Sequence, residues 1–188
     1  KPLGTRQIVQ QWIALSRAVG GRLEPVTLPS LVSADARSLL ANPIYLGDQP
    51  GFTQSSGWVD AWTSTPSAYA VRAKSAADVA AAVRFGREKN LRLVVKGGGH
   101  SYLGGSNAPD SILVWTREMD AIEMHDAFAP VGSAMAPVPA VSVGAGCTWG
   151  RVYDAVTTNG GRYVQGGGCT TVGVAGLVQG GGFGNFSK

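Results

Sequence analysis

The spacing of apolar residues predicts a helix near the start of the chain. Apolar side chains recur every three to four residues between positions 7 and 19, and Gly20-Gly21 ends the pattern. The residues concerned are Ile8, Trp12, Leu15 and Val19. The stretch Ser33–Leu40 is consistent with one more short helix.

Prolines divide the N-terminal part of the chain from the rest. Residues 22–57 contain Pro25, Pro29, Pro43 and Pro50, which interrupt any long element. We therefore expect residues 1–57 to form a helical and irregular arm that packs against something larger. Residues 58–188 would then form the main domain.

Three short apolar runs predict strands around one helix in the middle of the chain. This helix begins after Ser75, which can cap it together with Asp78 three residues later, and it continues to about Lys89. The predicted strands are Ala68–Arg72, Leu91–Val95 and Ser111–Trp115. The second strand leads straight into a glycine-rich loop, and such strand ends are where ligand sites are expected.

The last third of the chain predicts the same order of elements. A strand over Ala140–Val143 precedes a helix over Trp149–Thr158, and a short strand at Tyr163–Val164 leads into a second glycine-rich loop. The stretch Ala127–Pro139, rich in alanine, proline and glycine, is expected to be a surface connection.

Composition favours a compact, loop-rich fold. The 188 residues include 27 glycines, about twice the usual share, and 44% are hydrophobic, which argues against disorder. The net charge of +4 comes from scattered basic residues without interleaved aromatics, so nucleic-acid binding is not supported. No stretch approaches the roughly 18 consecutive apolar residues of a membrane span.

The two glycine-rich loops are the main candidate sites. The first is Lys96–Tyr102, and the second is Gly166–Gly173, which continues through Gly176 to Gly184. Because glycine lacks a Cβ atom, its backbone N–H groups can approach a ligand closely. A polyphosphate or the edge of a flat cofactor is the natural ligand for such a surface.

Each loop carries one side chain of a nucleophilic type. Cys169 follows three glycines, whose N–H groups could favour its thiolate, but a buried inert thiol or a disulfide with Cys147 is also compatible with the sequence. His100 also follows three glycines, and it could instead bond its own backbone. Two histidines and two cysteines without C-x-x-C spacing argue against a metal site.

Taken together, the motifs resemble a family of flavin enzymes. The matching stretches are Gly98-Gly99-His100-Ser101-Tyr102, Gly144-Ala145-Gly146 with Trp149-Gly150 and Tyr153, and Cys169-Thr170-Thr171-Val172-Gly173-Val174-Ala175-Gly176 with Gly180-Gly181-Gly182-Phe183-Gly184. Their order and spacing are similar to those of the vanillyl-alcohol oxidase and p-cresol methylhydroxylase (PCMH) family, berberine-bridge-enzyme-like branch. The resemblance covers about residues 58–188. It implies an α+β fold, namely a PCMH-type FAD-binding domain of two small mixed α/β subdomains, incomplete in this chain.

The resemblance also implies FAD held by two covalent bonds, from His100 to the flavin 8α-methyl carbon and from Cys169 to ring carbon C6. The other residues that it assigns to cofactor binding are Lys96, Gly97, Gly98, Gly99, Ser101, Tyr102, Thr170, Thr171, Val172, Gly173, Gly176, Gly180, Gly181 and Gly182. The implied reaction is oxidation of a small-molecule substrate of alcohol or sugar type, such as a carbohydrate or bulky alcohol, by hydride transfer to flavin N5 with O₂ as acceptor. Two alternatives stay open, a non-covalent FAD reductase of the same fold and a non-catalytic glycine-rich binding domain.

Members of this family continue well beyond a position equivalent to Lys188. The resemblance therefore implies that the catalytic base and the substrate domain lie outside this chain. We expect a second chain, produced by a nick after Lys188, to carry the C-terminal part of the same enzyme. The first residue is Lys1 rather than Met, which together with a stable oxidase favours a soluble secreted or periplasmic protein.

Overall fold

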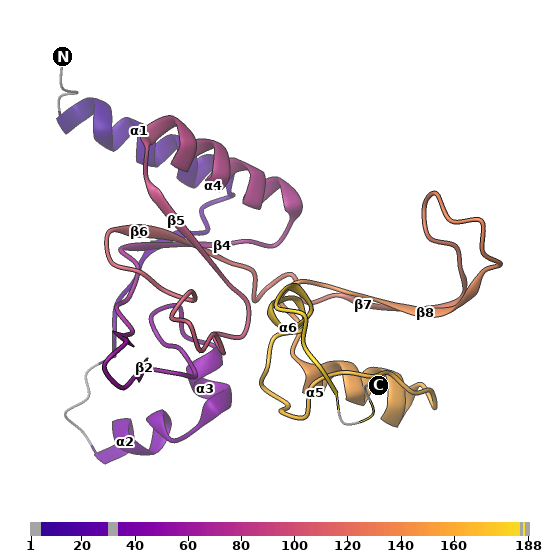
Figure 1. Ribbon diagram of the computed structural model, residues 1–188. Coiled ribbons are helices and arrows are strands. Elements are labelled where there is room, and N and C mark those ends of the chain that lie inside the picture. Colours follow the sequence, from indigo (N-terminus) through magenta and orange to yellow (C-terminus); the bar gives the residue numbers. More distant parts are fainter. Residues whose placement is uncertain (1–4, 30–33, 185, 187–188) are drawn as a thin grey trace.

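The computed structural model describes residues 5–29, 34–184 and 186. Figure 1 shows an N-terminal half built around a four-stranded sheet and a smaller C-terminal half from which a hairpin projects. The elements of the first half are α1 (Thr5–Ala18), β1 (Leu23–Pro25), α2 (Ala34–Leu40), α3 (Pro43–Gly47), β2 (Gly57–Trp58), β3 (Trp62–Thr63), β4 (Tyr69–Arg72), α4 (Ala76–Lys89), β5 (Arg92–Lys96) and β6 (Ser111–Trp115). Those of the second half are β7 (Ile122–Phe128), β8 (Val138–Val143), α5 (Trp149–Tyr153), the π-helical turn η1 (Asp154–Asn159) and α6 (Val174–Gln179).

Strand β6 lies in the interior of the main sheet. The strand order is β1-β4-β6-β5, with β1 antiparallel to β4 and the other three strands parallel. All five residues of β6 are buried, as expected for a parallel strand that is covered on both faces. The structure confirms the predicted strand Ser111–Trp115 and places β4 and β5 within one residue of their predicted bounds.

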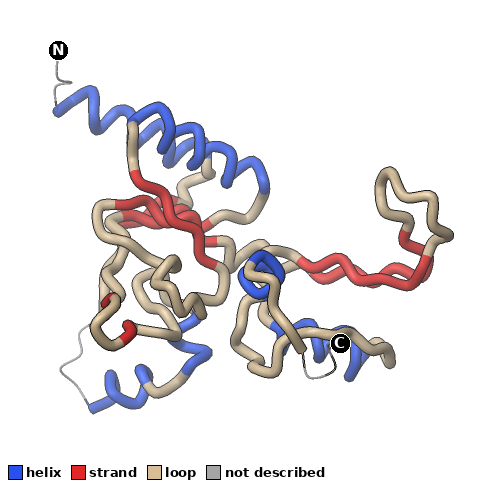
Figure 2. Tube along the Cα trace, viewed as in Figure 1, coloured by secondary structure: helices blue, strands red, loops and turns tan. Residues whose placement is uncertain are grey.

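Helices α1 and α4 cover one face of this sheet (Figure 2). The predicted capping box begins α4: Ser75 Oγ accepts a hydrogen bond from the N–H of Asp78 at 3.3 Å, and the Asp78 carboxylate accepts one from the N–H of Ser75 at 3.1 Å. Arg22, which follows α1, pairs with the same carboxylate at 2.6 Å. The buried residues between helices and sheet are Leu15, Val19, Val71, Ala73, Ala81, Ala82, Phe85, Ile112 and Val114.

The opposite face of the sheet is covered by irregular structure. Ala70, Leu113 and Trp115 are buried on this face, and Figure 1 shows α2, α3 and β2 beyond it. Part of the predicted arm is joined to the sheet, because β1 pairs with β4. The boundary after residue 57 stays a prediction.

The C-terminal half has its own small core around Cys147, Trp149 and Val152. Strands β7 and β8 form an antiparallel ribbon that projects from the body of the molecule (Figure 1). Val131 and Met135 at its tip are exposed. Strand β8 begins at Val138, two residues before the predicted strand Ala140–Val143, and β7, which was not predicted, reaches Phe128. The surface connection is therefore 129–137 rather than Ala127–Pro139.

Two further predictions for this half need correction. The helix predicted over Trp149–Thr158 divides into α5 and η1. The strand predicted at Tyr163–Val164 is wrong: these residues pair with no strand in the described part of the chain, and the Tyr163 side chain is exposed. The two halves therefore do not share one order of elements.

Candidate functional site

The two glycine-rich loops lie directly against each other. A Cβ atom on Gly98 would lie 2.6 Å from the backbone nitrogen of Gly173, and one on Gly173 would lie 2.7 Å from the nitrogen of Gly98. No side chain fits at either position, so this approach requires glycine on both loops. The φ angle of Gly99, +75°, is a second reason for glycine in the first loop.

Thr171 lies between the nucleophilic side chains of the two loops. Nε2 of His100 is 3.0 Å from Oγ1 of Thr171, and Sγ of Cys169 is 3.4 Å from the same oxygen. His100 is half-buried and Cys169 is exposed. Both cysteines are free, with Cys147 buried in the C-terminal core, so the disulfide that the sequence left open is not formed.

The surroundings of both side chains favour their nucleophilic forms. A hydrogen bond with the Thr171 hydroxyl is the main cause that lowers the pKa of the Cys169 thiol, and backbone hydrogen bonds of Thr171 and Val172 add to it. Burial lowers the pKa of His100, against a smaller raising effect of the Thr171 backbone. A lower thiol pKa increases the thiolate fraction, and a lower imidazole pKa increases the neutral fraction.

The side chain of Lys96 is occupied by a neighbouring loop. Its Nζ donates hydrogen bonds to the carbonyl oxygens of Gln49, Pro50 and Phe52 at 2.5 to 3.0 Å, and it lies 5.4 Å from the ring centre of Trp115. Burial lowers the pKa of Lys96 to about 7, whereas three acceptors favour the ammonium, because a neutral amine has only two N–H groups. These contacts make Lys96 a support of the first loop, and a direct contact with the cofactor stays a prediction.

Other predicted residues shape the two loops. Ser101 Oγ accepts hydrogen bonds from two N–H groups of the turn that follows it, and the Tyr102 carbonyl accepts one from the indole of Trp62. In the second loop, the carbonyls of Thr170 and Val172 accept hydrogen bonds from the first turn of α5. The first loop is therefore fixed by the turn that follows it and by Trp62, and the second loop by α5.

A pocket of about 290 Å³ opens beside the contact between the loops. Its walls include Ile44 of α3, Gly98, and Thr170 and Thr171 of the second loop, together with the side chains of Arg117 and Arg151. Gly97 lies next to the turn after β8, where its Cβ would be 3.2 Å from the Ala145 carbonyl. Of the predicted glycines, Gly98 lines this pocket, whereas Gly97, Gly99, Gly173, Gly176, Gly180, Gly181 and Gly182 do not, and the last four of these are exposed.

Several backbone N–H groups of the first loop, which reaches this pocket at Gly98, have no backbone partner in the described part of the chain. Among the described residues, no backbone hydrogen bond uses the N–H groups of Gly98, Gly99, His100 or Ser101. Unpaired donors on a thin glycine loop fit an anionic polyphosphate. The guanidinium groups of the lining residues Arg117 and Arg151 already pair with Asp48 and Asp120. The residues present therefore fit part of an FAD, which is larger than this pocket.

Sequence reasoning missed α3 and the two arginines. A local signal for α3 existed: Asn42 Oδ1 accepts a hydrogen bond from the N–H of Ile44 at 2.9 Å, and Pro43 occupies the first helical position. Arg117 had no local signal, because it bonds Asp48 and the Gly146 carbonyl, which are far away in the sequence.

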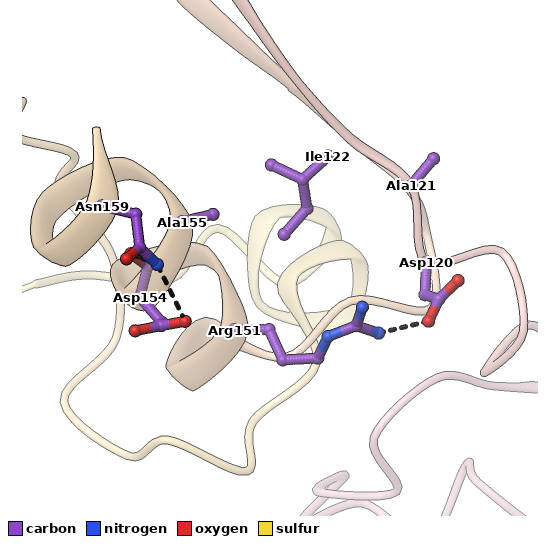
Figure 3. Close-up of a pocket in the computed structure, with 7 residues that line it drawn as sticks. All are labelled: Asp120, Ala121, Ile122, Arg151, Asp154, Ala155 and Asn159. Carbon is purple, nitrogen blue, oxygen red and sulfur yellow. Dashed lines mark hydrogen bonds and ion pairs between the residues drawn. The ribbon is translucent and has the colours of Figure 1, made fainter.

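A separate hollow lies beside α5 and η1 (Figure 3). Arg151 pairs with Asp120 on one side of it, and Asn159 donates a hydrogen bond to Asp154 at 3.2 Å on the other. No residue of either glycine-rich loop lines this hollow. It is therefore not the candidate cofactor site.

Comparisons with known proteins identify the family and the fold. The sequence model described as "FAD binding domain" matches residues 67–188, and the chain belongs to this family. The fold is confirmed as a PCMH-type FAD-binding domain: a VAO-type flavoprotein of Myceliophthora thermophila superposes with a TM-score of 0.78 at 26% identity, over 97% of this chain and 37% of that one.

Curated relatives are FAD-linked oxidoreductases. One from Arthroderma otae, easE, is 44% identical over 119 residues, which is 63% of this chain and 19% of that protein. Another, malF of Malbranchea aurantiaca, is 32% identical over 209 residues, which covers 94% of this chain and 35% of that protein. The chain thus spans about a fifth to a third of the length of these two relatives.

Proposed function

We propose that this chain forms the FAD-holding part of an FAD-dependent oxidoreductase and carries the cofactor on two covalent bonds. His100 would bind the flavin 8α-methyl carbon and Cys169 ring carbon C6. Each attachment replaces one hydrogen of the flavin and one of the side chain by a new bond. Dioxygen takes up these two hydrogens with their electrons as hydrogen peroxide.

The observation that carries this proposal is the pair of contacts to Thr171 Oγ1, at 3.0 Å from His100 and 3.4 Å from Cys169. Ring carbon C6 and the carbon C8 that bears the 8α-methyl group flank C7 at the benzenoid end of the flavin ring. Attachment at both atoms therefore requires two nucleophiles side by side. A neutral imidazole and a thiolate are favoured there by the lowered pKa values of both groups.

The loops would hold the rest of the cofactor through backbone donors. The N–H groups of Gly98–Ser101 suit the pyrophosphate, and Thr170–Gly173 would contact polar atoms of the ring. Contacts from Gly176 and Gly180–Gly182 are proposed on the resemblance alone. Bound FAD supplies a hydride acceptor, flavin N5, for an alcohol or sugar-type substrate, with O₂ as the final acceptor. The base that removes the substrate proton is proposed to lie outside residues 1–188.

We also propose a substrate class and a cellular compartment. A ring fixed at two points needs less enclosure by protein, which favours a bulky small molecule such as a carbohydrate. No helix within the described ranges is long and apolar enough to cross a membrane. Independently of this, the stability expected of a covalent flavin oxidase leads us to propose export of the protein, to be checked by its recovery from culture medium or periplasm.

A visible spectrum of acid-denatured full-length protein tests the proposal. We expect the flavin absorbance to stay with the precipitate, and peptide mass mapping to find flavin on His100 and Cys169. His100→Ala and Cys169→Ala should each keep only the other bond. His125→Ala, whose ring contacts Ser142 on the hairpin, is the matched control and should keep both. Flavin released by acid would favour a non-covalent enzyme, and absence of flavin a non-catalytic domain.

A further inference from the structure

We propose that the hydroxyl of Thr171 is a positioning group that couples the protonation states of His100 and Cys169, so that both become nucleophilic together. This inference rests on the proposed attachment of FAD to these residues. It assigns the Thr171 side chain a task distinct from the backbone contacts that the sequence suggested.

One hydroxyl can donate only one hydrogen bond, although its oxygen can accept others. Oγ1 of Thr171 contacts Nε2 of His100 at 3.0 Å and Sγ of Cys169 at 3.4 Å. When Cys169 is a thiolate, its sulfur can only accept, so the hydroxyl donates to sulfur. Nε2 of His100 must then carry the hydrogen that the Thr171 oxygen accepts.

This arrangement leaves both side chains in reactive forms. A neutral imidazole with hydrogen on Nε2 carries its lone pair on Nδ1, so the ring remains a nucleophile. In the opposite arrangement, the thiol donates to Thr171 and the hydroxyl donates to Nε2, which makes Cys169 the weaker nucleophile. The Thr171 hydroxyl is also the largest cause that lowers the pKa of Cys169.

The backbone around Thr171 is held firmly enough for this task. The carbonyl of Thr170 accepts a hydrogen bond from the N–H of Gly150 at 2.9 Å, and that of Val172 accepts one from Trp149 at 3.0 Å. On the other side, a Cβ on Gly98 would lie 3.0 Å from the Thr171 carbonyl oxygen. Thr171 is therefore fixed between α5 and the first loop, with its hydroxyl directed at both nucleophiles.

The test compares Thr171→Val, which keeps the shape without the hydroxyl, with Thr171→Ser, which keeps the hydroxyl. Full-length apoprotein is made under riboflavin limitation, FAD is added, and acid-stable flavin at each of the two residues is followed by peptide mapping. The alkylation rate of Cys169 by iodoacetamide is measured in the same apoproteins. Thr158→Val, an exposed threonine on η1, is the matched control.

We expect Thr171→Val to slow attachment at both residues and alkylation of Cys169 about tenfold each, the effect of roughly one pKa unit or one lost hydrogen bond. Thr171→Ser and Thr158→Val should stay within about twofold of the wild type. Equal binding of acid-releasable FAD before attachment shows that a variant is folded. If Thr171→Val does not fold, Thr171→Ala takes its place.

Slowing at only one residue, or equal slowing by Thr171→Ser, would overturn the coupling while the proposed attachment stands. If wild-type protein binds FAD but forms no acid-stable flavin, the proposed attachment fails. Cys169 alkylation then decides whether Thr171 acts on the thiol: an unchanged rate in Thr171→Val sinks this inference too.

Discussion

The ammonium of Lys96 supports the first glycine-rich loop through the neighbouring segment of the chain. Its three carbonyl partners belong to residues 49–52, and the N–H of Gln54, just beyond them, donates a hydrogen bond to the Gly99 carbonyl at 2.9 Å. Lys96, the last residue of β5, thus fixes the segment 49–54, and this segment in turn bonds Gly99, the residue before His100. Local sequence reasoning places Lys96 beside the loop, but its partners lie 44 to 47 residues away and leave no pattern near it.

Replacing Lys96 by methionine should remove these contacts while keeping an apolar stem of similar length. The three carbonyl oxygens lose a charged donor, and we expect the free energy of unfolding to fall by about 2–4 kcal/mol. Lys89→Met, at the end of α4, is the control and should change it by less than about 0.5 kcal/mol. Urea unfolding of both variants measures the difference. Equal free energies of unfolding for Lys96→Met and Lys89→Met would show that other donors replace Lys96 at the three carbonyl oxygens.

Helix α4 shows how local chemistry fixes an element. Burial raises the pKa of Asp78, but hydrogen bonds from Lys74, Arg22 and Ser75 outweigh it and hold the pKa below its ordinary value. The carboxylate caps α4 and joins it to the chain that follows α1. Its contribution to stability is therefore present above the unfolded pKa and is lost as pH falls through the lower, folded pKa.

Asp78→Asn should test this contribution and its sign. At pH 7 we expect unfolding to become easier by about 2 kcal/mol, the combined size of a helix cap and a charged hydrogen bond. The difference from the wild type should shrink below about pH 4, where the wild-type carboxyl also becomes protonated. Asp35→Asn, at an exposed position on α2, serves as control. A difference that persists unchanged at pH 2 would mean that the charge of Asp78 does not matter.

Elements with a complete local signal were predictable, and elements defined by partners were not. Ser75 and Asp78 mark the start of α4, and the apolar run Ser111–Trp115 marks β6, so both agree with the structure. Tyr163 and Val164 are residue types that favour strands, but in the described part of the chain they pair with no other strand. The sequence alone does not show whether a sheet has an unpaired edge strand near them. Helix α3 had a local signal in Asn42 and Pro43 that was overlooked, but its place in the pocket wall, like that of Arg117, arises only in the folded chain.

The two halves of the molecule meet where the glycine-rich loops touch. Arg117 joins them a second time, because it donates to Asp48 after α3 at 2.8 Å and to the Gly146 carbonyl at 3.1 Å. Gly146 has no room for a side chain: its Cβ would lie 2.0 Å from the Thr116 carbonyl oxygen. The candidate site is therefore a property of the interface, and neither half contains it alone.

Gly98→Ala should separate the halves at this interface. The new methyl group would lie 2.6 Å from the Gly173 nitrogen and 3.0 Å from the Thr171 carbonyl oxygen, and both neighbours are backbone atoms that cannot rotate away. We expect the free energy of unfolding to fall by about 1–3 kcal/mol, as for other overpacked sites. His100 would also move away from Thr171.

Gly105→Ala is the matched control for this variant, because its Cβ would meet only Ser101 Oγ at 3.6 Å, an ordinary contact. FAD bound per polypeptide and the thermal midpoint of the full-length protein are measured for both variants. Gly98→Ala should lose most of its FAD and melt earlier, whereas Gly105→Ala should match the wild type. Full FAD content in Gly98→Ala would show that the cofactor does not depend on contact between the two loops, and the site would then have to be sought within one half.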